Sequence, residues 1–193
     1  MLTTTHFRLA LPRIFPMAFH IMQVMSGLNR WGFLGRYVLS GWQVNGITTL
    51  SSGSPFTVTS GIDTNFDNVA TDRPNQIGNP VLDGQSLSQR VAQFFNPAAF
   101  QQVPLGSINP YGNVGRSSLL GPGYVNTDFS GFKNLPLEKY GNVQFRAELF
   151  NIFNTVQLAN PTAILSSPSD GKITALRSGS APRVAQFALR YTF

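Results

Sequence analysis

The last eight residues of this chain, QFALRYTF, alternate apolar with polar side chains and end on an aromatic residue. Side chains two positions apart lie on the same face of a β-strand, so the octet predicts a strand with two unlike faces. The apolar face consists of Phe187, Leu189, Tyr191 and Phe193. The polar face consists of Gln186, Ala188, Arg190 and Thr192. An exposed terminal Phe gains nothing from water, so the pattern favours a face that meets lipid, although a core strand of a soluble sheet would show the same alternation.

The composition supports a β-rich chain with few means of staying dissolved in water. Charged residues make up 11% of the 193 residues, against about 25% in typical soluble proteins. The 18 Gly, 13 Pro and 16 Phe are typical of strands joined by turns and irregular loops. No window holds the ~20 consecutive apolar residues of a membrane-spanning helix. We therefore expect an all-β fold without helical membrane spans.

The charged and catalytic residue types exclude several function classes. The net charge of +6 comes from basic residues scattered singly along the chain, whereas nucleic-acid binding needs a clustered basic surface. With no Cys, the chain has no disulfide and no thiolate metal site. The two histidines, His6 and His20, both lie near the start, and the many Ser residues lie in predicted turns. We therefore predict no enzyme activity, no cofactor and no nucleic-acid partner.

One acidic segment begins like a calcium-binding loop. Its oxygen-bearing side chains are Asp63, Asn65, Asp67, Asn68 and Asp72. However, Asn68 stands where the turn Gly of such a loop belongs, and Pro74 stands where its bidentate Glu belongs. We therefore interpret these residues as a solvated loop and predict no metal site.

Further segments also show strand patterns. Residues 143–154 alternate well but also fit the i, i+4, i+7, i+8 spacing of a helix, and their Phe content favours the strand. The terminal strand spans 182–193, and the weaker strands are 3–11, 42–52, 56–60 and 124–134. The turn composition of Ser52 to Pro55 predicts a hairpin between 42–52 and 56–60. Together these segments predict an antiparallel meander of about six strands.

The connections between the predicted strands alternate between short and long. Residues 52–55 and 135–142 are short connections, whereas 61–123 and 155–181 are long. Outer-membrane β-barrels sort their connections in this way, with short turns in the periplasm and long loops outside the cell. If the chain ends in the periplasm, every short turn falls inside and every long loop outside. The predicted fold is therefore a partial segment of a transmembrane β-barrel with long irregular extracellular loops.

A barrel assigns the two faces of the last two strands to lipid and to the lumen. The apolar residues predicted to face lipid are Val143, Phe145, Leu149, Phe187 and Leu189. The charged residues predicted to face the lumen are Arg146, Glu148 and Arg190. Charges are compatible with a water-filled lumen, where these side chains are expected to pair across strands or to contact a plug.

Several blocks in order resemble the carboxy-terminal part of a TonB-dependent outer-membrane receptor, of the large type with an amino-terminal carboxypeptidase-regulatory-like domain. The blocks are SGWQVNGITTLSSGSPFTV (40–58), TDRPNQIGNP (71–80), FFNPAAF (94–100), YGNVGRSSLLGPGYVNTDFSGFKN (111–134), VQFRAELFNIFN (143–154) and the terminal strand. The resemblance covers residues 40–193. Residues 1–39 match poorly, hold at most one predicted strand and show no convincing signal peptide, because Pro12 and Pro16 interrupt their apolar run.

The resemblance implies uptake of a large nutrient through the outer membrane of a Gram-negative cell, and it implies several partners. Gln186, Ala188, Tyr191 and Phe193 resemble the signal read by the barrel-assembly machinery, with Ala188 where the family more often has Gly. The other implied partners are outer-membrane lipid, the remaining barrel and plug of the receptor, and the energising TonB complex acting through an upstream part. About six strands cannot close a barrel, since the smallest known need about eight. We therefore expect a fragment that does not transport alone.

Two other readings fit the same patterns. A secreted soluble β-rich binding module would bury Phe187, Leu189, Tyr191 and Phe193 in its core and use the long loops for recognition. A small membrane barrel made from several copies of the chain would close its sheet between copies. The transported substrate, the oligomeric state and the ability to fold alone do not follow from these residues.

Overall fold

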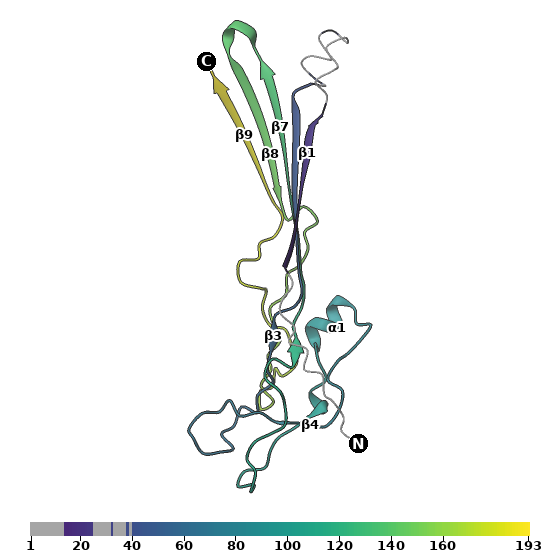
Figure 1. The fold of residues 1–193 in the computed structure, drawn as a ribbon, viewed down its shortest axis with the longest axis vertical. Coiled ribbons are helices and arrows are strands. Elements are labelled where there is room, and N and C mark those ends of the chain that lie inside the picture. The colour runs from purple at the N-terminus through teal and green to yellow at the C-terminus, as the bar shows by residue number, and fades with distance from the viewer. Residues whose placement is uncertain (1–13, 25–31, 33–37, 39) are drawn as a thin grey trace, which may run out of the picture. The chain divides into compact units, whose positions relative to one another are not determined.

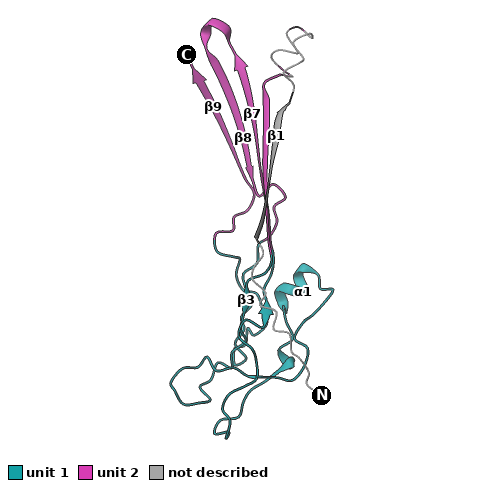
Figure 2. Cartoon of the chain, in the orientation of Figure 1, with its two compact units in different colours: residues 1–13, 52–123, 157–178 teal, residues 14–51, 124–156, 179–193 magenta. Residues whose placement is uncertain are grey.

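A computed structural model describes residues 14–24, 32, 38 and 40–193, and the chain divides into two compact units (Figure 2). The strand unit comprises 14–51, 124–156 and 179–193. The loop unit comprises 1–13, 52–123 and 157–178, of which the last two ranges are described. Both units take residues from distant parts of the sequence. The predicted strand at 3–11 and His6 lie outside the described residues.

The strand unit is a five-stranded antiparallel sheet in which spatial order follows chain order (Figure 1). Its strands are β1 (Ile14–Val24), β2 (Trp42–Ser51), β7 (Tyr124–Pro136), β8 (Asn142–Phe150) and β9 (Val184–Thr192). The all-β antiparallel meander expected from the sequence is therefore confirmed, with five strands in the described sheet instead of about six. The sheet is open among the described residues, as befits a partial barrel.

The two ends of this sheet carry connections of very different length. A short turn at 137–141 joins β7 to β8, and Gly141 adopts a φ of 100° there, which favours glycine. We call this the turn end, and β9 also finishes there. The connections β2 to β7 and β8 to β9 both leave from the opposite end, the loop end. The 137–141 turn and the two longest connections thus lie at opposite ends of the sheet.

The predicted hairpin between 42–52 and 56–60 is wrong. The strand β2 pairs along its whole length with β7, and the short strand β3 (Pro55–Phe56) pairs with β6 (Leu119–Leu120). Gly53 does not reverse the chain, because it lies against a second backbone: a Cβ there would stand 1.7 Å from the carbonyl oxygen of Gly121. The chain therefore continues beyond the β2–β7 pair in two segments, one after Ser51 and one before Tyr124. Because β2 is antiparallel to β7, it runs in the direction opposite to the one that the predicted hairpin required.

The predicted strand at 143–154 is confirmed only as far as Phe150, and its helical alternative is wrong. Asn151 has a φ of 50° and its side-chain amide donates to the carbonyls of Thr155 and Ala181 at 3.1 and 3.0 Å. The Asn151 backbone N–H donates to Asp128 of β7 at 2.9 Å. These hydrogen bonds satisfy a tight turn, so the strand ends where the alternation at Phe150 and Ile152 fails.

The loop unit has a hydrophobic core of its own. Its buried residues are Val58, Phe95, Ala99, Phe100, Val114 and Leu119. Around them lie the β3–β6 pair, the pair of β4 (Asn75–Gln76) with β5 (Phe100–Gln101), and helix α1 (Leu87–Ala92). The second long connection joins the first where Thr59 donates to Ala163 and accepts from Leu165, both at 2.9 Å. Segments about 100 residues apart therefore share one core.

Candidate functional site

The strand register sorts the predicted site residues onto two faces. Val143 lies opposite Tyr191, Phe145 opposite Leu189, and Ala147 opposite Phe187. Opposed residues of an antiparallel pair share a face, so all five residues predicted to face lipid lie on one face. Arg146, Glu148 and Arg190 lie on the other. We call these the apolar face and the polar face of the sheet.

The apolar face is exposed among the described residues. The Phe145 and Phe187 rings stack with centroids 6.2 Å apart. Phe187 and Leu189 remain 69% and 74% exposed, although water would favour their burial. Large apolar side chains also come from β2 and β7 to this face, as Trp42, Val125 and Phe129 do. An exposed apolar face of this kind marks a surface that meets lipid or another protein.

One lysine interrupts the apolar face near the turn end. The Lys133 ammonium donates to the carbonyl oxygens of Val38, at 3.0 Å, and Ser40, and it lies 5.3 Å from the centroid of the Trp42 ring. Two carbonyls and an aromatic face compensate a cation taken from water. Sequence reasoning missed this charge because its compensating partners lie about 90 residues away.

The polar face of β7, β8 and β9 carries a connected set of side chains. Arg146 lies 3.6 Å from Glu148 on its own strand, and its guanidinium lies 4.6 Å from the centroid of the Phe132 ring. Gln144 donates to Asn134 at 2.8 Å. Arg190 lies opposite Gln144, so the predicted charged residues share a face, but the Arg146–Glu148 pair forms along β8 and not across strands as predicted.

The terminal residues of β9 are tied to the short turn. The Tyr191 hydroxyl donates to the carbonyl oxygen of Tyr140 at 2.5 Å, and the Tyr191 and Phe193 rings lie 5.9 Å apart. Gln186 and Ala188 lie on the polar face, opposite Glu148 and Arg146. The four residues predicted to form an assembly signal therefore divide between the two faces, with both aromatics near the turn end.

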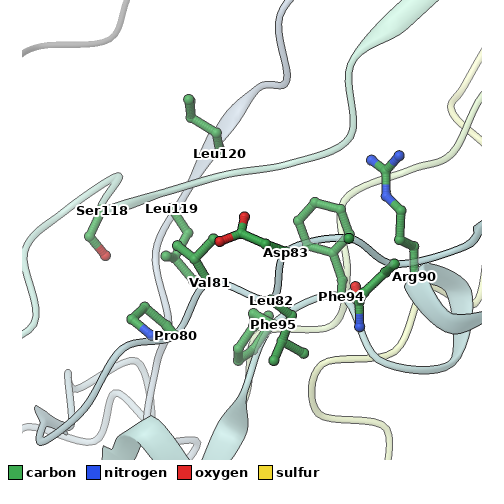
Figure 3. Close-up of a pocket in the computed structure, with 12 residues that line it drawn as sticks. Pro80, Val81, Leu82, Asp83, Arg90, Phe94, Phe95, Ser118, Leu119 and Leu120 are labelled. Atoms are coloured by element: carbon green, nitrogen blue, oxygen red, sulfur yellow. The ribbon is translucent and has the colours of Figure 1, made fainter.

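The loop unit contains a pocket of about 550 Å³. It is lined by Pro80, Val81, Leu82, Asp83, Gly84, Gln85, Arg90, Phe94, Phe95, Ser118, Leu119 and Leu120 (Figure 3). This volume lies within the range of small-molecule sites, which are mostly apolar with a few polar groups. Sequence reasoning did not find the pocket. The block FFNPAAF contains Phe94 and Phe95 of one wall, but no local sequence pattern indicates that residues 118–120 form another wall.

Helix α1 positions the basic wall of the pocket. Ser86 and Gln89 form a reciprocal capping box, in which the Ser86 side chain accepts from the Gln89 backbone and Gln89 accepts from the Ser86 N–H at 2.8 Å. The cap holds the start of a helix too short to be stable alone. Arg90 in its last turn lies over the Phe94 ring, 5.7 Å from the centroid.

The acidic segment beside the core uses its carboxylates to hold its own backbone. Asp72 accepts from the Thr64 N–H at 2.6 Å, the Thr64 hydroxyl at 2.8 Å and the Asn65 N–H at 3.2 Å. Asp63 accepts from the N–H groups of Asp67 and Asn68. Within the described part of the chain, no three acidic or histidine side chains gather as metal ligands would.

The acid stability of the loop unit should depend on Asp72. Hydrogen bonds from Thr64 lower the pKa of this carboxyl below 3.8. A lowered folded-state pKa stabilises the fold above the unfolded value, and this contribution is lost as the pH falls through the folded pKa. Asp72→Asn should therefore lower the urea midpoint of the loop unit near neutral pH, and its difference from the unmodified chain should shrink as the pH falls through the folded pKa.

Asp170 should respond with the opposite sign. Burial raises the pKa of Asp170 above 3.8, so its contribution is present at low pH and is lost as the pH rises through the folded pKa. Asp170→Asn should raise the urea midpoint near neutral pH.

Equal shifts of the urea midpoint by Asp72→Asn near neutral pH and at acid pH would contradict the hydrogen-bonding role of Asp72.

The larger part of the chain matches the model of one known protein family. Residues 20–186 match the family model described as outer membrane beta barrel domain. No curated protein and no solved structure gives a significant match. Among the described residues, no helix is both long and apolar enough to cross a membrane.

Proposed function

The chain belongs to the outer membrane beta barrel domain family, and we propose that it is the carboxy-terminal barrel segment of a TonB-dependent receptor for energised uptake of a large nutrient. One observation carries this proposal. Both long connections leave one end of the sheet and fold into a unit with a shared core, whereas a short turn and the end of β9 lie at the other. Outer-membrane barrels divide short and long connections between the periplasm and the outside in this way.

The receptor type is supported by the ordered blocks between residues 40 and 193. The five described strands are fewer than the roughly eight that close a barrel, so we propose that the remaining barrel strands complete the wall and a plug fills the lumen. The polar face of β8 and β9 then lines the lumen, and the apolar face contacts lipid. The barrel-assembly machinery reads the residues at the end of β9, and the TonB complex energises the receptor through its upstream part.

The proposed orientation predicts unequal protease accessibility in intact cells. A protease recognition sequence inserted next to Ile108, which is fully exposed in the loop unit, should be cleaved from outside. The same sequence inserted after Lys139 in the 137–141 turn should be cleaved only after the outer membrane is permeabilised. Cleavage of the turn in intact cells would overturn the orientation.

Energised uptake is tested in cells that carry the complete receptor. A protonophore should stop internalisation of the nutrient and leave its binding to the cell surface unchanged, because only release into the cell draws on the inner-membrane gradient. Uptake that continues with the protonophore would identify a passive pore and contradict the TonB-dependent assignment, while leaving the family membership intact.

A further inference from the structure

We propose that the pocket of the loop unit binds a short peptide with apolar side chains and free termini. We call its apolar lining residues Val81, Leu82, Phe95 and Leu119 the floor, and its two charged lining residues Asp83 and Arg90 the rim. The pocket volume of about 550 Å³ accommodates a di- or tripeptide. The placement of this pocket outside the cell rests on the proposed function, whereas the binding itself does not.

The rim of the pocket carries one negatively charged and one positively charged side chain. In the view of Figure 3, the Asp83 carboxylate and the Arg90 guanidinium lie on opposite sides of the Phe94 ring. Among the described residues, neither the Asp83 carboxylate nor the Arg90 guanidinium has a hydrogen-bond or ion-pair partner, and the guanidinium lies over the Phe94 ring. Both charges are therefore available to a ligand.

This arrangement matches a zwitterion with an apolar body. A peptide ammonium carries three donors and suits the acceptor-only Asp83, whereas a peptide carboxylate suits the fork of N–H donors on Arg90. The side chains would then contact the apolar floor and Phe94. A neutral sugar offers hydroxyl groups to such a rim but leaves both charges without a counter-charge and has little apolar surface for the floor.

Capped ligands separate the two charged contacts. We expect leucyl-leucine to bind the full chain in detergent micelles with a dissociation constant of about 0.1–1 mM, the range expected for a ligand of its size. Isothermal titration calorimetry near neutral pH, where both termini are charged, provides the measurement. The N-acetyl and carboxamide forms should each bind about tenfold more weakly, because each loses one charge-assisted contact.

Two variants assign each contact to one residue. Arg90→Gln should weaken binding of leucyl-leucine about tenfold and leave its carboxamide form unaffected. Asp83→Asn should do the same for leucyl-leucine and leave its N-acetyl form unaffected. Because each variant keeps one ligand at unchanged affinity, that ligand also reports that the loop unit is folded.

Several outcomes would overturn the inference. These are no saturable binding of leucyl-leucine up to about 10 mM, equal affinity for free and capped forms, and equal weakening of every form by Arg90→Gln. Binding of maltotriose in place of the peptide would identify a sugar site and also contradict it. Loss of uptake in cells with peptide binding intact would count against the proposed receptor and leave the pocket assignment standing.

Discussion

Phe187→Arg is expected to lower the free energy of unfolding of the lipid-embedded barrel by about 2–4 kcal/mol, the cost of an arginine on the lipid face near the bilayer midplane. Phe187 lies near the middle of β9 on the exposed apolar face. Denaturant titration in lipid vesicles measures the change. The matched control is Gln186→Arg, one residue away on the polar face and opposite Glu148, which should cost less than about 1 kcal/mol.

A third variant separates the charge from the aromatic contact. Phe187→Leu removes the stacking on Phe145 without adding a charge, and it should cost about 0.5–1.5 kcal/mol beyond the lost area. If Gln186→Arg proves more destabilising than Phe187→Arg, the two faces have been assigned in reverse.

Stability alone does not distinguish a lipid-facing residue from a residue in a soluble core. Because the chain contains no Cys, a single Cys placed at Phe187 or at Gln186 can carry a polarity-sensitive fluorophore without background labelling. Brominated lipid should quench the label at position 187 strongly and the label at 186 weakly. Equal, weak quenching at both positions would instead favour the soluble binding module.

Phe95→Ala is expected to destabilise the loop unit by about 3–5 kcal/mol, as deletion of a buried aromatic ring usually does. The Phe95 side chain is 2% exposed, and its ring lies 6.0 Å from that of Phe56 and 5.9 Å from that of Phe100. Hydrogen exchange should show amides within 52–123 and 157–178 opening together, about 10² to 4 × 10³ times more often than in the unmodified chain.

The control for this change is another aromatic residue of the same unit. Tyr111 is 65% exposed, so Tyr111→Ala should alter exchange little. Amides of β7 and β8 should keep their protection in both variants, because the strand unit has its own ladder of hydrogen bonds. If Phe95→Ala accelerates exchange in 52–123 but not in 157–178, the two long connections do not share one core.

The local pattern of the chain predicted the strands better than their partners. Residues 124–134 and 182–193 were placed within two residues of β7 and β9 at every end, because period-two alternation is a property of neighbouring residues. The hairpin at Ser52 to Pro55 was wrong because Gly53 gives the same signal for a reversal of the chain as for a close approach to another backbone.

The sequence did not predict the candidate pocket, because the pocket also depends on contacts between distant segments. Its walls come from residues 80–95 and 118–120, which meet only after the core around Phe95 and Leu119 has formed. Arg90 carried no signal of its own, because a lone basic residue on a short polar helix is usually a solvated one.

The sequence by itself determined the two faces of β8 and β9, the short turn between β7 and β8, and the place of the aromatic terminus near that turn. These follow from alternation and spacing, which act within one strand or one turn. Only the tertiary structure decided that β2 pairs with β7, that the two long connections share a core, and that Asp83 and Arg90 line one pocket. Each of these depends on contacts between residues far apart in the chain, which no local pattern encodes.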